Sequence, residues 1–210
     1  MTGAGWSEAE RALVAADPAL GRLIARVGPC ALEPHGLPPY EALVRSVVYQ
    51  QLSGKAAETI LGRLLDSFGG SVPDPADLAA APAEQLRAAG LSRAKSAALA
   101  DLAAHVIDGR LPGLDQVRAL DDESIIERFT MVRGVGPWTA HMYLMFGLGR
   151  PDVLPDTDLG VQEGARRVYG GDRPGPAMLR EIGERWRPWR TIGSWYMWRA
   201  VDAKQDDLAT

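Results

Sequence analysis

Apolar residues recur every three or four positions along most of the 210-residue chain, which is the spacing of amphipathic α-helices. Helices are predicted around residues 7–14, 40–48, 57–65, 84–89, 92–108, 121–129 and 140–146. The sequence has no strand-length alternation of apolar and polar residues, no internal repeat and no low-complexity tract. The pattern therefore predicts an all-α fold.

Several residues mark where these helices start. Ser7 and Glu10 have the spacing of a capping box, in which each side chain hydrogen-bonds a backbone amide of the first turn. Ser92 is the expected cap of a long helix whose apolar face runs as far as Ile107.

Proline and glycine clusters divide the chain. Residues 28–39 form an irregular connector, and Gly149-Arg150-Pro151 is the best boundary between two helical lobes. We expect one compact catalytic unit over residues 1–210, made of lobe A, residues 38–150, and lobe B, residues 1–37 plus 151–210.

The composition excludes several classes of protein. The apolar and charged fractions, 46% and 24%, are those of a globular chain large enough to form a core without a disulfide. Cys30 is the one cysteine and the three histidines are scattered, so no metal site is predicted. No 18-residue apolar run and no leader pattern occur, which indicates a cytoplasmic protein without a membrane partner.

The net charge of −4 conceals an asymmetry along the chain. Residues 161–200 carry eight arginines and four acids, a net charge of +4, so the remainder sums to −8. Such a segment is either an ordinary solvated surface or a basic face suited to phosphates. The charge alone does not decide between them.

The stretch Phe129–Ala140 carries the clearest chemistry in the sequence. An apolar helix runs into Gly134-Val135-Gly136, and a second apolar helix starts at once with Pro137. The glycines allow close approach of a ligand to the backbone, and the free amides at the helix start attract an anion. A plain helix–helix turn is the alternative, but the flanking helices and the placement of the proline favour an anion site.

This stretch resembles the helix–hairpin–helix of the DNA glycosylase superfamily that carries the motif. Three further segments match its alkylbase branch, the AlkA type or 3-methyladenine glycosylase II, in the same order along the chain: Val47–Ala57, Val153–Val161 and Arg187–Trp198. The resemblance covers residues 17–200 and implies a two-lobed helical fold that lacks the N-terminal α/β domain of larger relatives. It also implies that Gly134, Gly136 and Thr139 bind DNA.

The same resemblance implies a catalytic carboxylate. Cleavage of an N-glycosidic bond builds positive charge on the deoxyribose, which a fixed carboxylate near C1′ stabilises. Asp158 is the preferred residue because its Asp-Leu-Gly-Val context matches the alkylbase branch, and Asp156 is the alternative. Asp158 also stands where a helix N-cap is expected, a role compatible with catalysis.

The residue after Gly136-Pro137 separates two reaction types. Bifunctional relatives place a lysine nucleophile there, whereas this chain has Trp138, which indicates base hydrolysis without strand cleavage. The endonuclease III group also carries four C-terminal cysteines, and these are absent.

Aromatic residues indicate the substrate. Four of the six tryptophans fall between Trp186 and Trp198, and an indole attracts a positively charged base. Trp138, Trp198 and Tyr49 are the predicted pocket residues, while Trp186 and Trp189 are expected to be core.

A side chain must fill the gap that a flipped nucleotide leaves in the duplex. The register of the resemblance puts Gln51 at this wedge position with Leu52 beside it, and the choice between them stays open because relatives carry an apolar wedge.

We therefore expect a monofunctional DNA glycosylase, acting as a monomer on double-stranded DNA that contains alkylated bases and leaving an abasic site. The alternative is a non-catalytic helix–hairpin–helix module that binds damaged DNA. No cofactor is expected, apart from a monovalent cation that the resemblance implies at the hairpin in a DNA complex.

Overall fold

The computed structural model describes residues 5–202, and over this range the chain forms helices and no strand, which confirms the all-α prediction. It divides into two compact units, each described here by itself: residues 36–143, and residues 1–35 with 144–210. In this division the second unit resumes at Leu144, inside the π-helical turn Tyr143–Gly147 that continues α10, Pro137–Met142, a few residues before the predicted boundary Gly149–Pro151.

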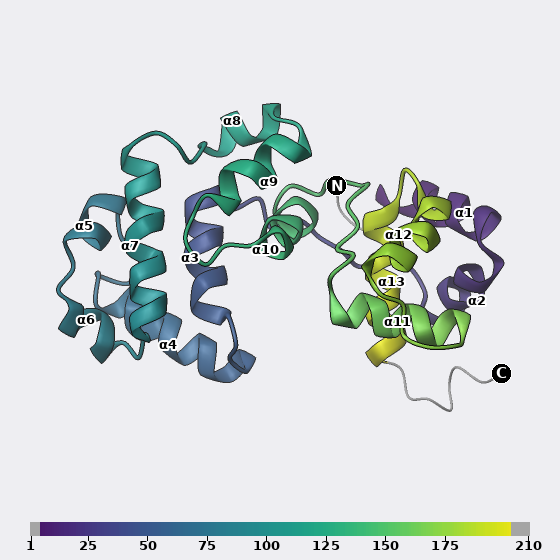
Figure 1. Cartoon of the computed structure of the whole chain (residues 1–210), viewed down its shortest axis with the longest axis horizontal. Helices are drawn as coiled ribbons and strands as arrows, with labels where there is room; N and C mark the ends of the chain where they lie inside the picture. Colours follow the sequence, from purple (N-terminus) through teal and green to yellow (C-terminus); the bar gives the residue numbers. More distant parts are fainter. Residues whose placement is uncertain (1–4, 203–210) are drawn as a thin grey trace. The chain divides into compact units, whose positions relative to one another are not determined.

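The first unit, residues 36–143, is built around one long helix. Its helices are α3 Pro39–Tyr49, α4 Gly54–Asp66, α5 Pro75–Ala80, α6 Ala83–Ala88, α7 Arg93–Ile107, α8 Leu114–Ala119, α9 Asp122–Thr130 and α10 Pro137–Met142. Helix α7 packs against α3, α5 and α6 (Figure 1). Its apolar face buries Leu99 and Leu102 completely, which removes apolar surface from water and holds the unit together.

The predicted start of α7 is confirmed and its predicted apolar end is wrong. Ser92 is the N-cap, and its hydroxyl accepts a hydrogen bond from the Lys95 backbone N–H at 3.3 Å. Ile107, the last residue of α7, is 57% exposed, and the buried residues of the helix end at His105.

The second unit combines both ends of the described chain. Its helices are α1 Ser7–Ala16, α2 Pro18–Val27, α11 Leu159–Tyr169, α12 Pro176–Gly183 and α13 Arg190–Asp202. Its core gathers large side chains from distant segments, among them Trp6, Trp186 and Tyr196. The Trp6 indole N–H donates to the Leu32 carbonyl at 2.9 Å, so its one polar atom is satisfied inside the core.

The start of α1 differs from the predicted capping box. Trp6 occupies the N-cap position and Ser7 is already the first helical residue. The Glu10 carboxylate turns inward and accepts hydrogen bonds from the Cys30 backbone N–H at 2.6 Å and the Tyr196 hydroxyl at 2.8 Å. Burial of Trp6 fixes the entry of the chain and overrides the local capping pattern.

Helices α11 and α13 approach closely because α11 carries a glycine at their contact. A Cβ at Gly164 would overlap the carbonyl oxygen of Met197 and lie 2.7 Å from its Cα. The two backbones therefore meet with no side chain between them. This contact brings Asp158, at the start of α11, within hydrogen-bond distance of Trp198 on α13.

The thiol of Cys30 is expected to be unreactive in the folded protein. Cys30 is 1% exposed, and burial raises the pKa of its thiol to about 11, so little thiolate exists at neutral pH. A thiol-specific chromogenic disulfide at pH 8 should react with it only after denaturant is added. Rapid stoichiometric reaction of the native protein would contradict this placement.

Candidate active site

The hairpin lies between α9 and α10, where the sequence predicts it. Gly134 adopts a φ of +77°, the left-handed region that favours glycine. Gly136 is the extended N-cap residue of α10, and a Cβ there would meet nothing within 4 Å. Gly134 thus makes the turn, while Gly136 leaves open space over the backbone.

Two side chains from other helices hold this hairpin. The Asp101 carboxylate on α7 accepts a hydrogen bond from the Arg133 backbone N–H at 2.7 Å. The Gln50 side-chain amide donates to the Gly134 carbonyl at 2.9 Å. Thr139, the third residue of the hairpin region predicted to bind DNA, is only 5% exposed. Its side chain is therefore packed beneath the surface.

The predicted wedge residues form a tight turn between α3 and α4. The Leu52 backbone N–H donates to the Tyr49 carbonyl at 3.3 Å, and Gln50 has φ −51° and ψ 130°. Gln51 then takes a φ of +58°, as at the third position of a type II turn, where glycine is usual. Gln51 and Leu52 are both exposed, so both stay open as the wedge.

Lys95 supports this turn from α7. Its ammonium donates to the Val48 carbonyl at 2.6 Å, near the C-terminal end of α3, where a positive charge is favourable. Desolvation lowers the pKa of Lys95. With the Gln50–Gly134 bond, this contact fixes the turn and the hairpin to each other within one unit.

Replacement of Gln51 by glycine is expected to raise stability and lower activity. Glycine removes the strain of a side chain at positive φ, for a net gain of about 0.5–1 kcal/mol, and it also removes one of the two candidate wedge side chains. Chemical denaturation and single-turnover base release measure the two effects. The neighbouring Ser53→Gly is the control, because Ser53 has a φ of −69° and should lose a few tenths of a kcal/mol. Equal destabilisation by both changes would contradict the strain at Gln51.

Asp158 is the N-cap residue of α11, as predicted. Its Oδ1 accepts hydrogen bonds from the Val161 backbone N–H at 2.8 Å and from the Trp198 indole N–H at 2.9 Å. The carboxylate lies at the positive end of an eleven-residue helix, where a negative charge is stabilised. It is therefore oriented by two donors from two helices.

Asp156 has a different environment. Its carboxylate forms an ion pair with Arg180, and its backbone carbonyl accepts a hydrogen bond from the Gln162 side chain at 2.9 Å. A carboxylate already paired with a guanidinium is a poorer stabiliser of a developing cation. This environment favours Asp158 over Asp156 as the catalytic carboxylate.

The aromatic residues occupy contrasting positions. Trp186 is fully buried and its indole N–H donates to the Tyr169 hydroxyl at 3.2 Å, which makes it part of the core. Trp198 is half-buried, with its ring 5.7 Å from that of Phe146. Trp138 and Tyr49 are 43% and 38% exposed and belong to the unit that carries the hairpin, whereas Trp198 and Asp158 belong to the other.

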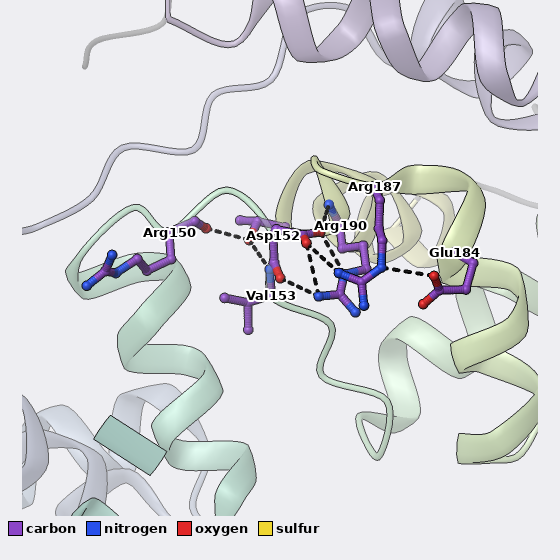
Figure 2. Close-up of polar contacts among 7 residues, drawn as sticks. Arg150, Asp152, Val153, Glu184, Arg187 and Arg190 are labelled. Carbon is purple, nitrogen blue, oxygen red and sulfur yellow. Dashed lines mark hydrogen bonds and ion pairs between the residues drawn. The ribbon is translucent and has the colours of Figure 1, made fainter. Parts of the chain in front are cut away.

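Arginine pairs hold the segment that leads to Asp158. Asp152 accepts hydrogen bonds from the Arg190 guanidinium at 2.6 Å and from the Arg187 guanidinium at 2.7 Å (Figure 2). The Thr191 hydroxyl donates to the Arg150 carbonyl at 2.6 Å and accepts from the Val153 backbone N–H at 3.1 Å. The start of α13 thus anchors residues 150–153.

These pairs also change the interpretation of the basic segment. Seven of its eight arginines form ion pairs: Arg166, Arg167, Arg180, Arg185, Arg187, Arg190 and Arg199. Four of the acidic partners lie outside residues 161–200: Asp17, Asp152, Asp156 and Asp202. The net charge of +4 is therefore balanced locally and does not by itself indicate a phosphate-binding face.

Four further residues shape the site without having been predicted to do so. Gln50 and Asp101 fix the hairpin, Asp152 anchors the segment before Asp158, and Gly160 leaves space beside Asp158. Gln50 and Gly160 lie inside the matched motifs, which is a signal that could have drawn attention to them. Asp101 and Asp152 carry no such signal.

Within residues 5–202, no group of three or more His, Cys, Asp or Glu side chains is arranged to hold a metal ion. Of the helices described there, none has the length and apolar character needed to cross a bilayer.

The hairpin in one all-helical unit and the helix-capping carboxylate in the other define a protein of the helix–hairpin–helix class. A family model described as "HhH-GPD superfamily base excision DNA repair protein" matches residues 44–188. The chain belongs to this superfamily.

Individual relatives agree with this membership. DNA-3-methyladenine glycosylase 1 of Schizosaccharomyces pombe is 36% identical over 163 residues, which cover 77% of this chain and 72% of the relative. The structure of a 3-methyladenine DNA glycosylase of the same organism, in complex with abasic DNA, has a TM-score of 0.84 and 33% identity and covers 95% of this chain and 98% of that one. A DNA-3-methyladenine glycosidase from Bacillus halodurans has a TM-score of 0.84 and 38% identity over 92% of this chain and 89% of that one. The resemblance to the AlkA-type branch is confirmed.

Proposed function

We propose that this chain, a base excision repair glycosylase for alkylated bases, hydrolyses the N-glycosidic bond of 3-methyladenine- or 7-methylguanine-type bases flipped from duplex DNA. Water supplies the oxygen that bonds to C1′ of the deoxyribose, the base leaves with the electrons of the broken bond, and an abasic site remains. The observation that carries the proposal is the Asp158 carboxylate, held at the start of α11 by the Val161 and Trp198 N–H groups.

The charge of Asp158 matches the requirement of the reaction. As the bond to the base breaks, positive charge develops on the sugar, and a fixed carboxylate lowers the energy of that state. Bases alkylated at N3 or N7 already carry a positive charge, so they leave without being protonated by the protein. An exposed indole such as Trp138 attracts such a base through cation–π interaction, worth about 0.5–2 kcal/mol.

The proposed reaction stops at the abasic site. Trp138 stands at the second position of α10, where lyase relatives carry a lysine, and an indole cannot form a Schiff base with the sugar. The relative from Schizosaccharomyces pombe was solved with abasic DNA, the product that such a reaction leaves.

DNA contact is assigned to the hairpin and to the neighbouring turn. Backbone amides near Gly134 and Gly136 face a phosphate, and Gln51 or Leu52 fills the space of the extruded nucleotide. We propose that the protein acts as a monomer, since one chain carries both the hairpin and the carboxylate, and that it is cytoplasmic.

A monovalent cation at the hairpin is part of the proposal for the DNA complex. Carbonyl oxygens are suitable ligands for a hard cation, and the hairpin supplies backbone carbonyls. The Val132 and Gly134 carbonyls each accept one hydrogen bond, from the Val135 N–H and the Gln50 amide, which leaves a second lone pair on each oxygen.

Base release from methylated DNA tests the proposed function. The purified protein is incubated with duplex DNA treated with a methylating agent, and free bases are separated and quantified. We expect 3-methyladenine and 7-methylguanine to be released and the strand to break only after alkali. Release of no base, with DNA binding retained, would instead indicate a damage-binding module. A covalent adduct trapped by borohydride would contradict the monofunctional reaction.

A further inference from the structure

Trp198 contacts the proposed catalytic carboxylate through the one polar atom of its side chain. The indole N–H donates to Asp158 Oδ1 at 2.9 Å, on the oxygen that also accepts the Val161 N–H at 2.8 Å. An indole N–H is a donor only, so this bond requires an acceptor at Asp158. Trp198 therefore does more than offer an aromatic face.

The second donor constrains the carboxylate in a way that the cap alone does not. The Val161 N–H belongs to α11, the helix that Asp158 itself begins, whereas Trp198 projects from α13. Donors from two helices fix both the position of Oδ1 and the orientation of the carboxylate group. The carboxylate is thereby held in one orientation before any substrate arrives, which is what preorganised catalysis needs.

Gly160 makes room for this contact. A Cβ at this position would lie 2.8 Å from Trp198 Cδ1, 3.0 Å from Trp198 Nε1 and 3.1 Å from Asp158 Oδ1. The indole also lies beside Phe146, with the ring centroids 5.7 Å apart. A residue larger than glycine at position 160 must displace the indole from the carboxylate.

We propose that Trp198 is a positioning residue, whose indole N–H orients the Asp158 carboxylate toward the sugar, and that Gly160 is required for it to do so. This inference rests on the proposed function. It differs from the prediction that Trp198 lines the base pocket. A pocket residue contacts the base through its aromatic face, and its function does not depend on the indole N–H.

Trp198→Phe separates the two roles, since phenylalanine keeps an aromatic ring and lacks the N–H. We expect the single-turnover rate of 7-methylguanine release to fall at least about tenfold, with the dissociation constant for DNA holding an abasic-site analogue unchanged. Trp195→Phe is the matched control. The Trp195 ring packs edge-on against Tyr196 at 4.9 Å and under Arg199 at 5.2 Å, so its loss should leave the rate unchanged.

Gly160→Ala provides a second test in which the indole itself is kept. Alanine favours a helix more than glycine does, so the α11 backbone tolerates the change, while its Cβ displaces Trp198. We expect the same loss of rate as for Trp198→Phe. The indole N–H resonance of Trp198 in the NMR spectrum should move upfield in Gly160→Ala, because the hydrogen bond to Asp158 is lost.

The outcomes are distinguishable from failure of the proposed function. A wild-type protein that releases no base overturns that function and this inference with it. An active wild type, with Trp198→Phe and Gly160→Ala both at full rate, overturns the positioning role alone. A double change of Asp158→Asn with Trp198→Phe should be no slower than Asp158→Asn, whereas a pocket wall would add its own loss.

Discussion

Asp158→Asn is expected to reduce the rate of base release about 100- to 1,000-fold while DNA affinity stays unchanged. The amide has the shape of the carboxylate, and its oxygen can still accept the N–H groups of Val161 and Trp198. The substitution therefore removes the negative charge and leaves the geometry of the cap. Single-turnover kinetics with 7-methylguanine in a defined duplex measures the rate, and titration with abasic-analogue DNA measures the affinity.

The matched control is Asp156→Asn. Because the Asp156 carboxylate is already paired with the half-exposed Arg180, its loss should change the rate by less than about threefold. A large loss for Asp156→Asn combined with a small one for Asp158→Asn would reverse the assignment of the catalytic carboxylate. Loss of DNA affinity in Asp158→Asn would show that the change disturbs the fold.

Gly164→Ala is expected to destabilise the protein by about 3 kcal/mol or more, since the new methyl group overlaps backbone atoms that cannot move aside. The Met197 carbonyl lies in the middle of α13, so the two helices must separate to accept the methyl group. That separation also draws Asp158 away from Trp198, because these residues belong to the same two helices. Urea denaturation followed by circular dichroism measures the stability.

Gly62→Ala is the control for this prediction. Gly62 lies inside α4, and a Cβ there meets nothing within 4 Å. Alanine should therefore stabilise that helix by about 0.5–1 kcal/mol through its higher helix propensity. Similar effects for the two glycine substitutions would mean that the close approach of α11 and α13 is not the cause.

Periodicity predicted α3, α4, α7 and α9, whereas α2, α11 and α13, which have similar lengths, were not predicted from it. In α3, within the helix predicted around residues 40–48, the apolar residues Leu43, Val44, Val47 and Val48 follow the helical spacing and are all buried. The helices α5 and α8 have six residues each, too few for a 3.6-residue period to be recognisable. The N-cap at Ser92 was predictable because its side chain hydrogen-bonds the first turn of its own helix. The predicted cap at Ser7 was wrong because the burial of Trp6 determines where α1 begins.

The sequence supplies candidate site residues but not the contacts between them. Asp158 and Trp198 stand 40 residues apart, and their hydrogen bond depends on how α11 packs against α13. Asp156 and Arg180, 24 residues apart, likewise pair through tertiary packing. No spacing rule in the sequence shows that Asp156 pairs with an arginine whereas Asp158 is oriented by N–H donors. That difference arises only when distant helices pack together.

The fixed segment before Asp158 has a consequence for how substrates are chosen. Residues 150–153 are bonded to the start of α13 (Figure 2). The Asp156 carbonyl accepts a hydrogen bond from Gln162, and Asp158 caps α11. The Asp158 carboxylate is therefore already in place when a damaged base arrives. We therefore expect the extruded nucleotide to move to the carboxylate, and not the carboxylate to the nucleotide. Discrimination between damaged and normal bases accordingly falls on the ease with which each nucleotide leaves the double helix and each base leaves its sugar.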